Sequence, residues 1–266
     1  MRRLRAKWLL SATCALTALA LIAGCGGGNN DNSSSSGKVK QNLRVGSDIP
    51  YVPFEFGDPP AYDGFDMDLM HEIAKRLGLR LDVQKTPFDT IFRDLAQGKF
   101  DMVASAATIT PERKKEVDFS DSYFPADQSL MVKKGSDVKT VDDLAGKIVG
   151  AQLGTTGADY AKNKTKASSV RTYDLIDDAF NALEAGQVAA VINDCPVSVY
   201  ALRAHKDLAV VQAIQTNEQY GFAFRKGSDT LRSAVNKELK TLRDSGELQK
   251  ISNKWLGAKP CTLHAG

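Results

Sequence analysis

The chain has 266 residues, and its 35 Lys and Arg against 32 Asp and Glu give a formal net charge of +3. The basic excess belongs to the N-terminal end, because residues 1–24 hold four basic side chains and no acidic one. The remaining residues carry 31 basic and 32 acidic side chains, a net charge of −1. A chain without a basic patch is not expected to bind nucleic acid.

Residues 1–25 have the organisation of a bacterial export signal. A basic segment with Arg2, Arg3, Arg5 and Lys7 precedes an apolar run from Trp8 to Ile22. The run ends in LIAGC at 21–25, which resembles a lipobox, in which Cys25 receives a lipid and becomes the first mature residue. A transmembrane anchor is the alternative, but the apolar run is short for a bilayer span. We therefore expect residues 1–24 to be a lipoprotein signal peptide and the protein to be extracytoplasmic, anchored to the cell membrane by lipid.

Residues 25–39 are predicted to be a flexible tether between the lipid and the folded part. The segment 26–37 reads GGGNNDNSSSSG and cannot bury enough apolar surface to fold.

Two cysteines remain for the folded part of the chain. Cys14 lies in the signal segment and Cys25 is the lipidation site, which leaves Cys195 and Cys261. Two thiols in an exported protein are expected to form a disulfide, with two free thiols as the alternative. No metal-ligand cluster accompanies them, so we expect neither a metal nor another cofactor.

Residues 40–129 predict a first α/β lobe. A strand at 43–47 runs into a loop rich in aromatic residues and proline, which is typical of a parallel sheet whose carboxyl edge borders a cleft. Apolar residues then recur every fourth position at Phe65, Leu69, Ile73 and Leu77, a pattern that predicts an amphipathic helix ended by Gly78. A strand at 79–83, a helix at 88–97 and a strand at 100–104 follow.

The stretch from Ala104 to Tyr123 suits a carboxylate ligand. It combines the end of a strand, hydroxyl groups such as those of Ser105 and Thr108, a helix opened at Pro111 with Thr110 as its N-cap, and Arg113 in the first turn. Taken alone, the same pattern is more often an ordinary helix start with a solvated arginine.

Residues 130–221 predict a second lobe with the same alternation. Helices are expected at 140–144, 159–163, 176–185 and 197–205, and strands at 148–153 and 189–192, with a glycine-rich turn at 154–158. The segment FRDLAQGKFDMV at 92–103 matches FNALEAGQVAAV at 180–191 with an offset of 88 residues. Either the lobes are duplicated or this is a generic helix-to-strand connection. Duplication would place Ser105, Thr108 and Arg113 opposite Asn193 and Asp194.

Extended stretches near 129–133 and 220–225 are expected to cross between the lobes. Each is followed by a similar turn, KKGSD at 133–137 and RKGSD at 225–229. Two crossings form a hinge, which suggests closure around a ligand. The chain would then complete the first lobe with residues 222–266, including a long helix over 229–256.

Several linked motifs of this chain resemble the solute-binding proteins of polar amino-acid ABC transporters, of the His, Lys/Arg and Gln binding type. They are GSDIPYVPFEF at 46–56, GFDMDL at 64–69, ATITPERKKEVDFSDSY at 107–123 and GTTG at 154–157. The resemblance covers roughly residues 40–257. It implies a two-lobed periplasmic-binding-protein type II fold, with two α/β lobes joined by a two-strand hinge.

The resemblance also implies a ligand site. Thr108 and Arg113, with Ser105 beside them, would hold the ligand α-carboxylate, joined by Thr156 from the second lobe, and Asp194 would take the α-ammonium. The alternative for Asp194 is a helix N-cap. Asp48, Tyr51 and Phe88 would line the side-chain pocket, with Asp48 at a polar or cationic tip. That favours a basic or amide amino acid, because an acidic one would place two carboxylates together.

The chain departs from this family at two places. Ala106 replaces a residue that is Ser or Gly in some relatives, and Cys195 directly follows Asp194, so a bridge to Cys261 would tie the C-terminus to the second lobe.

Three functions are compatible with the sequence. The first is a monomeric, non-enzymatic binder that delivers an amino acid to an ABC permease. The second is a dehydratase of the cyclohexadienyl or arogenate kind, which would need a general acid in the pocket. The third is a lipid-tethered amino-acid sensor subunit.

Overall fold

The computed structural model describes residues 42–257 and residue 261. The predicted signal peptide, Cys25 and the tether lie outside these residues. Within the described ranges no helix has both the length and the apolar character of a membrane span.

The first lobe is built on a five-stranded sheet with the order β4-β1-β5-β12-β6. Strands β1 (Asn42–Ser47), β4 (Arg80–Lys85) and β5 (Met102–Val103) are parallel, whereas β12 (Ala223–Arg225) runs antiparallel to β5 and to β6 (Val117–Phe119). A short hairpin of β2 (Phe56–Asp58) and β3 (Ala61–Asp63) precedes the first helix.

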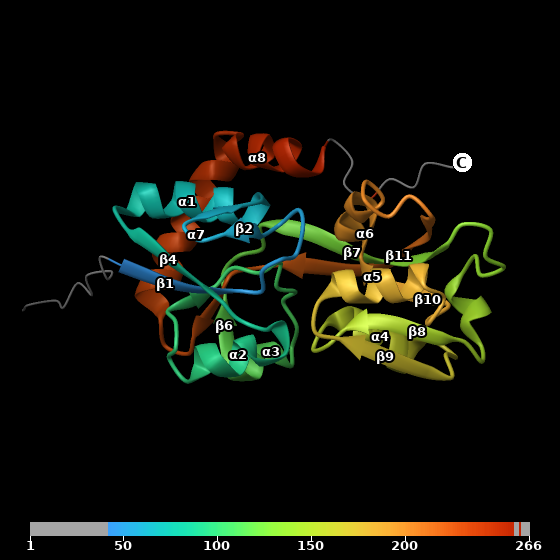
Figure 1. Ribbon diagram of the computed structural model, residues 1–266. Coiled ribbons are helices and arrows are strands. Elements are labelled where there is room, and N and C mark those ends of the chain that lie inside the picture. Colours follow the sequence, from blue (N-terminus) through green and yellow to red (C-terminus); the bar gives the residue numbers. More distant parts are fainter. Residues whose placement is uncertain (1–41, 258–260, 262–266) are drawn as a thin grey trace, which may run out of the picture. The chain divides into compact units, whose positions relative to one another are not determined.

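Helices cover both faces of this sheet (Figure 1). Helices α1 (Phe65–Leu77), α7 (Asp229–Asp244) and α8 (Glu247–Leu256) pack together on one side, and α2 (Phe88–Ala96) and α3 (Arg113–Glu116) lie on the other. The period of the apolar residues explains α1, since Phe65, Leu69 and Ile73 are all fully buried. Gly78, with a φ of 67°, ends the helix by donating its N–H to carbonyl groups of the last turn.

The second lobe has a five-stranded sheet with the order β11-β7-β10-β8-β9. Its strands are β7 (Phe124–Lys133), β8 (Ile148–Gln152), β9 (Ser169–Tyr173), β10 (Ala190–Asp194) and β11 (Leu208–Tyr220). A 3-10 helix (Val141–Leu144) and α4 (Thr156–Lys164) share one apolar cluster, while α5 (Ile176–Glu184) and α6 (Cys195–Ala201) share another. Alternate residues of β10 enter the two clusters, so this sheet is also covered on both faces.

The two lobes repeat one topology. In each, three parallel strands are followed by an antiparallel one, in the orders β4-β1-β5-β12 and β9-β8-β10-β7. Helices α2 and α5 both have nine residues and start 88 positions apart, at Phe88 and Ile176. Gly98 and Gly186, at φ values of 80° and 72°, turn each helix into its strand. The offset of 88 residues found in the sequence therefore separates equivalent elements of the two lobes.

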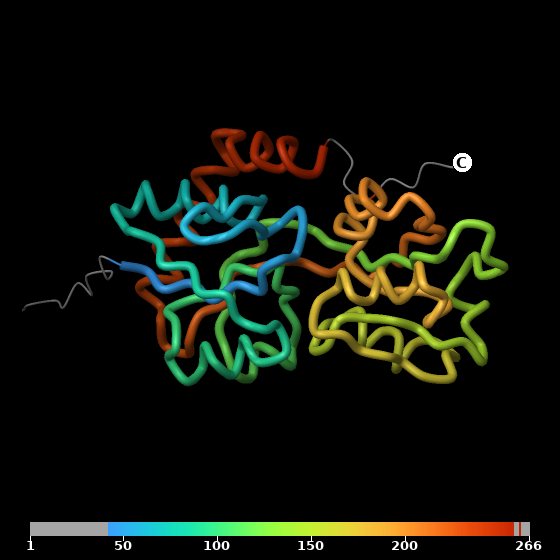
Figure 2. Tube along the Cα trace, in the orientation of Figure 1, coloured from blue at the N-terminus to red at the C-terminus, as the bar shows by residue number. Residues whose placement is uncertain are grey.

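The chain passes between the lobes twice (Figure 2). It leaves the first sheet after Phe119 and enters the second at Phe124, and it returns between Tyr220 and Ala223. Phe124 pairs with Tyr220, so the two passages lie side by side. Residues 129–133, where we expected the outward crossing, lie within β7 and pair with β10 and β11.

Some predicted helices have other bounds in the structure. The helix expected over 229–256 is two helices, because Gly246 has a φ of 75° between α7 and α8. Helix α6 ends at Ala201 rather than at residue 205. The helix expected at Pro111 begins at Arg113 and lasts four residues, since the chain must turn back into β6 at Val117. The Thr110 hydroxyl nevertheless accepts the Arg113 N–H (3.1 Å).

Candidate functional site

A pocket lies where the parallel strands of both sheets end. Tyr51 and Ser105 follow β1 and β5 in the first lobe, and Gln152 and Asp194 end β8 and β10 in the second. The carboxyl ends of parallel strands are the common ligand position in open α/β sheets. The pocket is lined from the first lobe by Tyr51, Phe88, Ser105, Ala106, Thr108 and Arg113, and from the second by Gln152, Thr155, Thr156 and Asp194.

The structure brings together most of the residues that the sequence singled out. Seven of the eight predicted ligand-binding residues line this one pocket, although they come from segments up to 143 positions apart. Asp48 is the exception. Its buried carboxylate accepts the side-chain N–H of Gln152 (2.6 Å), so Gln152 stands at the pocket wall in its place.

Arg113 is held at the pocket by contacts with both lobes. Its Nη1 donates to the carbonyl oxygen of Thr108 (2.8 Å) and its Nη2 to that of Gly154 (3.1 Å). The guanidinium lies over the rings of Phe88 and Phe92, 5.1 and 4.6 Å from their centroids. Burial lowers the pKa of Arg113 to about 10, against the raising effect of nearby Asp194 and Glu218, so the group remains a cation at neutral pH.

Asp194 is the central anion of the pocket. Its Oδ2 accepts hydrogen bonds from the hydroxyls of Tyr51 (2.6 Å) and Tyr220 (2.5 Å), and its Oδ1 accepts one from the amide of Gln128 (2.5 Å). Burial raises the pKa of Asp194 to about 6, and the charge of Glu218 adds to this, while the three hydrogen bonds lower it. The residue occupies the N-cap position of α6, but its side chain makes no capping bond.

A second carboxylate, that of Glu218, lies beside the pocket. Its Oε2 accepts hydrogen bonds from the hydroxyls of Thr108 (2.8 Å) and Thr156 (2.7 Å). Thr108 belongs to the first lobe and Thr156 begins α4 in the second, so Glu218 joins the two.

Two buried acids support the loop that carries Ser105 and Thr108. Ala106 has a φ of 42°, which is unusual for a residue with a Cβ atom, and its N–H donates to Asp66 (2.8 Å). The Ser105 hydroxyl donates to Glu55 (2.8 Å) and accepts the Asp48 N–H (2.9 Å). Burial raises the pKa of both Glu55 and Asp66, and the charge of Asp66 raises that of Glu55 further.

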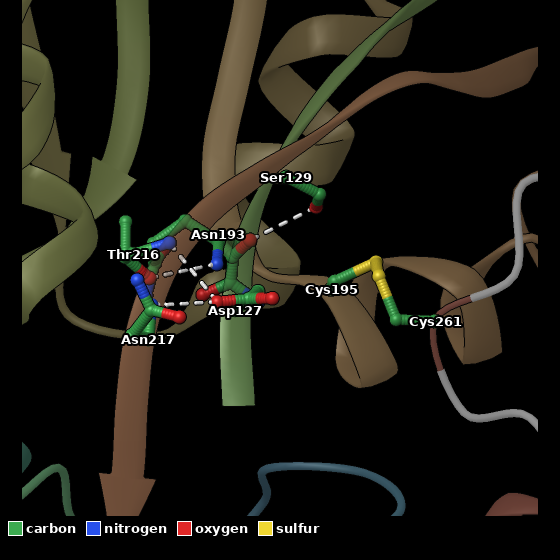
Figure 3. Close-up of a disulfide and its surroundings, with 8 residues drawn as sticks. Asp127, Ser129, Asn193, Cys195, Thr216, Asn217 and Cys261 are labelled. Carbon is green, nitrogen blue, oxygen red and sulfur yellow. Dashed lines mark hydrogen bonds between the residues drawn. A yellow bond between two sulfur atoms is a disulfide. The ribbon is translucent and has the colours of Figure 1, made fainter. Parts of the chain in front are cut away.

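Cys195 and Cys261 form a disulfide, as the sequence predicted, with their Cα atoms 5.5 Å apart (Figure 3). Cys195 is fully buried at the start of α6, directly after Asp194. The bond therefore attaches residue 261 to the second lobe next to the pocket.

Sequence reasoning missed several polar residues of the site, namely Gln128, Gln152, Thr155, Glu218 and Tyr220. Gln152 could have been found, because it is a polar residue at the end of a buried strand just before the glycine-rich turn. Glu218 and Tyr220 lie on β11, a strand with no clear apolar alternation, of which the sequence predicted only the end, in the extended stretch that starts at residue 220.

A model of one protein family matches almost all of the folded part. The family, described as bacterial extracellular solute-binding proteins, family 3, aligns with residues 43–258. The chain belongs to this family.

Curated relatives match nearly the whole chain. It is 36% identical over 255 residues to the arginine-binding extracellular protein ArtP of Bacillus subtilis, a match that covers 94% of this chain and 97% of ArtP. It is 34% identical over 247 residues to the L-cystine-binding protein TcyJ of Escherichia coli, which covers 91% of this chain and 93% of TcyJ. The chain is thus similar to proteins named for different amino acids.

Solved structures confirm the two-lobed type II fold. An ancestral arginine-binding protein bound to arginine aligns with a TM-score of 0.78 at 39% identity, over 82% of this chain and 99% of the other. The ancestral amino acid-binding protein AncCDT-1, described as a precursor of cyclohexadienyl dehydratase, aligns with a TM-score of 0.76 at 41% identity, over 81% of this chain and 95% of the other.

Proposed function

We propose that this family 3 protein binds a polar L-amino acid, basic or amide, outside the cytoplasm and delivers it to an ABC permease. The observation that carries the proposal is the pairing of opposite charges across one pocket. Arg113 offers a half-buried cation and Asp194 a buried anion, from different lobes. Two opposite charges in one pocket suit a zwitterion, whose carboxylate and ammonium would each be costly to bury alone.

Gln152 supports a ligand with a donor at the tip of its side chain. Its Nε2 donates to Asp48 (2.6 Å) and to the carbonyl oxygen of Asp174 (2.9 Å), which engages both amide protons. The amide is left with its Oε1 to offer, which accepts no hydrogen bond from the described residues. A guanidinium, ammonium, imidazole or amide tip would supply the donor, whereas a carboxylate tip would not. In this proposal Asp48 acts through Gln152 rather than by direct contact.

The proposed cellular arrangement rests on the N-terminal sequence and on the family. The chain would be exported, cleaved before Cys25 and held at the membrane by lipid through the tether of residues 25–39. Relatives named for arginine and cystine binding support an amino acid as cargo. The binder would act as a monomer that closes around its ligand by bending at the two passages between the lobes.

An enzymatic role of the dehydratase kind is the second candidate, because AncCDT-1 is described as a precursor of such an enzyme. That neighbour is itself an amino acid-binding protein, and the Arg113 and Asp194 arrangement suits an amino acid equally in this chain. We therefore favour the binder.

A thermal-shift screen tests the proposal. The purified protein would be unfolded and refolded without reductant to remove bound ligand, then heated with each of the twenty amino acids. A basic or amide amino acid should raise the melting temperature, since a ligand that binds only the folded state stabilises it by mass action. No shift with any amino acid would overturn the proposal, and a shift with prephenate alone would favour the dehydratase.

A further inference from the structure

Glu218, which lies beside the pocket, follows an irregularity in its strand. Ile214 pairs with Gln128 and Glu218 with Ala126, so β11 has two more residues than β7 across this interval. Such a bulge redirects the side chains that follow it. Figure 3 shows how it is held, with the Asp127 carboxylate accepting the N–H groups of Thr216 (2.9 Å) and Asn217 (2.8 Å).

The contacts of Glu218 decide which way two hydroxyl protons point. A threonine hydroxyl has one proton to donate and two lone pairs with which to accept. Thr108 and Thr156 both donate to Glu218 Oε2, at 2.8 and 2.7 Å, so neither proton is available to a ligand. Both residues line the same pocket, so their hydroxyls can offer a ligand only lone pairs.

The two hydroxyls differ in how much accepting capacity remains. Thr156 Oγ1 already receives a long contact from the Gln128 amide (3.4 Å), which also donates to Asp194 (2.5 Å). Thr108 Oγ1 accepts no hydrogen bond from the residues that the structure describes. Thr108 is therefore the stronger acceptor, and it belongs to the same pocket as the Asp194 carboxylate.

We propose that Glu218 is a positioning residue for the ligand α-ammonium group. By fixing the hydroxyl protons of Thr108 and Thr156, it turns the Thr108 oxygen into an acceptor that shares the ammonium with Asp194. This inference rests on the proposed function. It keeps Thr108 at the carboxylate through its backbone N–H and differs from the family resemblance in the Thr156 hydroxyl, which the resemblance gave to the carboxylate.

The ligand carboxylate is then left to other donors. Arg113 uses one N–H each of Nη1 and Nη2 for carbonyl groups, which leaves three of its five N–H groups. The backbone N–H of Thr108 also points away from Tyr220, its partner in an isolated bridge. The hydrogen bonds of this bridge are donated by the N–H groups of Ile109 and Gly221 instead. The pocket thus offers donors for the carboxylate in Arg113 and the Thr108 N–H, and acceptors for the ammonium in Asp194 and the Thr108 hydroxyl.

Binding measurements on matched variants test this role. Calorimetry would compare the wild type with Glu218→Gln, Thr108→Val, Thr108→Ser and the double variant Glu218→Gln/Thr108→Val. The probes are the amino acid identified by the thermal-shift screen and its α-carboxamide, which keeps the ammonium and lacks the carboxylate. Melting of the ligand-free variants reports their folding.

The expected result is specific to the ammonium. Glu218→Gln and Thr108→Val should each lower the affinity for the amino acid by about tenfold or more, as expected for a lost hydrogen bond to a charged group. Thr108→Ser should bind with nearly the wild-type affinity. The double variant should bind as tightly as the single variant with the lower affinity, because Glu218 acts through Thr108. The carboxamide should show the same fold-loss as the acid in Glu218→Gln.

Other outcomes would overturn the inference. If Glu218→Gln bound the amino acid more tightly than the wild type does, but not its α-carboxamide, Glu218 would compete with the ligand carboxylate. Unchanged affinity with a lowered melting temperature would mean a purely structural role, and additive losses in the double variant would mean that Glu218 does not act through Thr108. Absence of any amino-acid binding by the wild type would instead overturn the proposed function, and this inference with it.

Discussion

Single residues set the charge pattern of the pocket. Arg113, which is half-buried, and Asp194, which is buried, are oppositely charged and come from different lobes, and each already has fixed protein partners. A ligand group that meets them therefore finds oriented partners rather than mobile ones, which reduces the entropy lost on binding.

Removal of either charge should abolish binding of every amino acid. Arg113→Ala or Asp194→Ala would leave one charged group of the ligand buried without a partner, a loss of about 3 to 5 kcal/mol. The thermal shift produced by the ligand in the wild type should disappear in both variants. Arg203→Ala is the control, because Arg203 lies over the ring of Tyr200 outside the pocket (4.1 Å) and its loss should leave the shift unchanged. Normal binding by Arg113→Ala would show that the carboxylate is held elsewhere.

Asp48→Asn should change the preference among amino acids rather than abolish binding. An ionised Asp48 only accepts, which forces the Gln152 amide to turn its N–H toward it. An asparagine at position 48 can donate as well as accept. The Gln152 amide could then turn over, accept from residue 48 and present its N–H group to the ligand. Competition binding with basic, amide and acidic amino acids would measure the change. An unaltered ranking would contradict the role given to Asp48 and Gln152.

Binding and ligand-free stability should respond to pH in opposite directions. Burial raises the pKa of Asp194 to about 6 from its usual 3.8, so acidification from pH 7 to 5 protonates it and removes the anion needed by the ammonium. Affinity should therefore fall. The folded ligand-free protein, however, takes up more protons than the unfolded chain between pH 3.8 and 6, so the contribution of Asp194 to stability rises as the pH falls through this window.

Burial likewise raises the pKa of Asp48 to about 6, so Asp48 also makes the ligand-free protein more stable as the pH falls. Calorimetric titrations and ligand-free melting curves at pH 5 and 7.5 would measure both quantities. An affinity that does not change between these values would contradict the assignment of Asp194.

At the scale of elements, the turn between β8 and α4 brings the lobes into close approach. Gly154 has a φ of 77°, its carbonyl oxygen accepts from Arg113, and a Cβ atom there would lie 2.8 Å from the Cα atom of Asp89 on α2. The turn thus works only with glycine, both for its backbone conformation and for its contact with the other lobe.

Gly154→Ala should weaken ligand binding as well as folding. Gly186 is a matched control, with a φ of 72° and nothing within 4 Å of an added Cβ atom. Both substitutions should cost about 1 to 2 kcal/mol of folding stability from backbone strain. Only Gly154→Ala should also lower affinity, because the added methyl group pushes α2 away from the turn. Equal affinities of the two variants would mean that this approach of the lobes is not needed for binding.

At the scale of the whole molecule, the disulfide adds a third covalent connection between the lobes. Helix α8 packs in the first lobe and ends at Leu256, and Cys261 is bonded to the first residue of α6 in the second. Five residue steps span at most about 18 Å, so the end of α8 cannot move far from α6 while the bond is intact. The connection therefore limits any opening at the hinge.

Cys261→Ser should destabilise the protein by about 2 to 4 kcal/mol, as expected for loss of a native disulfide. The sequence separation of 66 residues makes the closed loop long, which favours the upper end of this range. Chemical denaturation of the variant, and of the wild type with and without reductant, would measure the loss. Reductant should destabilise the wild type and leave the variant unaffected. Equal stability of oxidised wild type and variant would contradict the prediction.

The sequence by itself determined the family, the alternation of strands and helices, and most of the pocket. These features depend on local patterns. The spacing of apolar residues defined α1, glycines at the ends of α1 and of the helix-to-strand turns were recognisable, and the repeat of 88 residues located Ser105 and Asp194 at equivalent strand ends.

Only the tertiary structure decided which polar groups meet. Glu218 contacts Thr108 across 110 positions and Gln152 contacts Asp48 across 104, through a bulge and through the register between separate elements. No local pattern encodes such contacts, because a shift of one residue in strand pairing would turn the same side chain to the other face of the sheet. The physical reason is that periodicity fixes an element from its own residues, whereas the direction of a hydroxyl proton depends on what the rest of the fold places beside it.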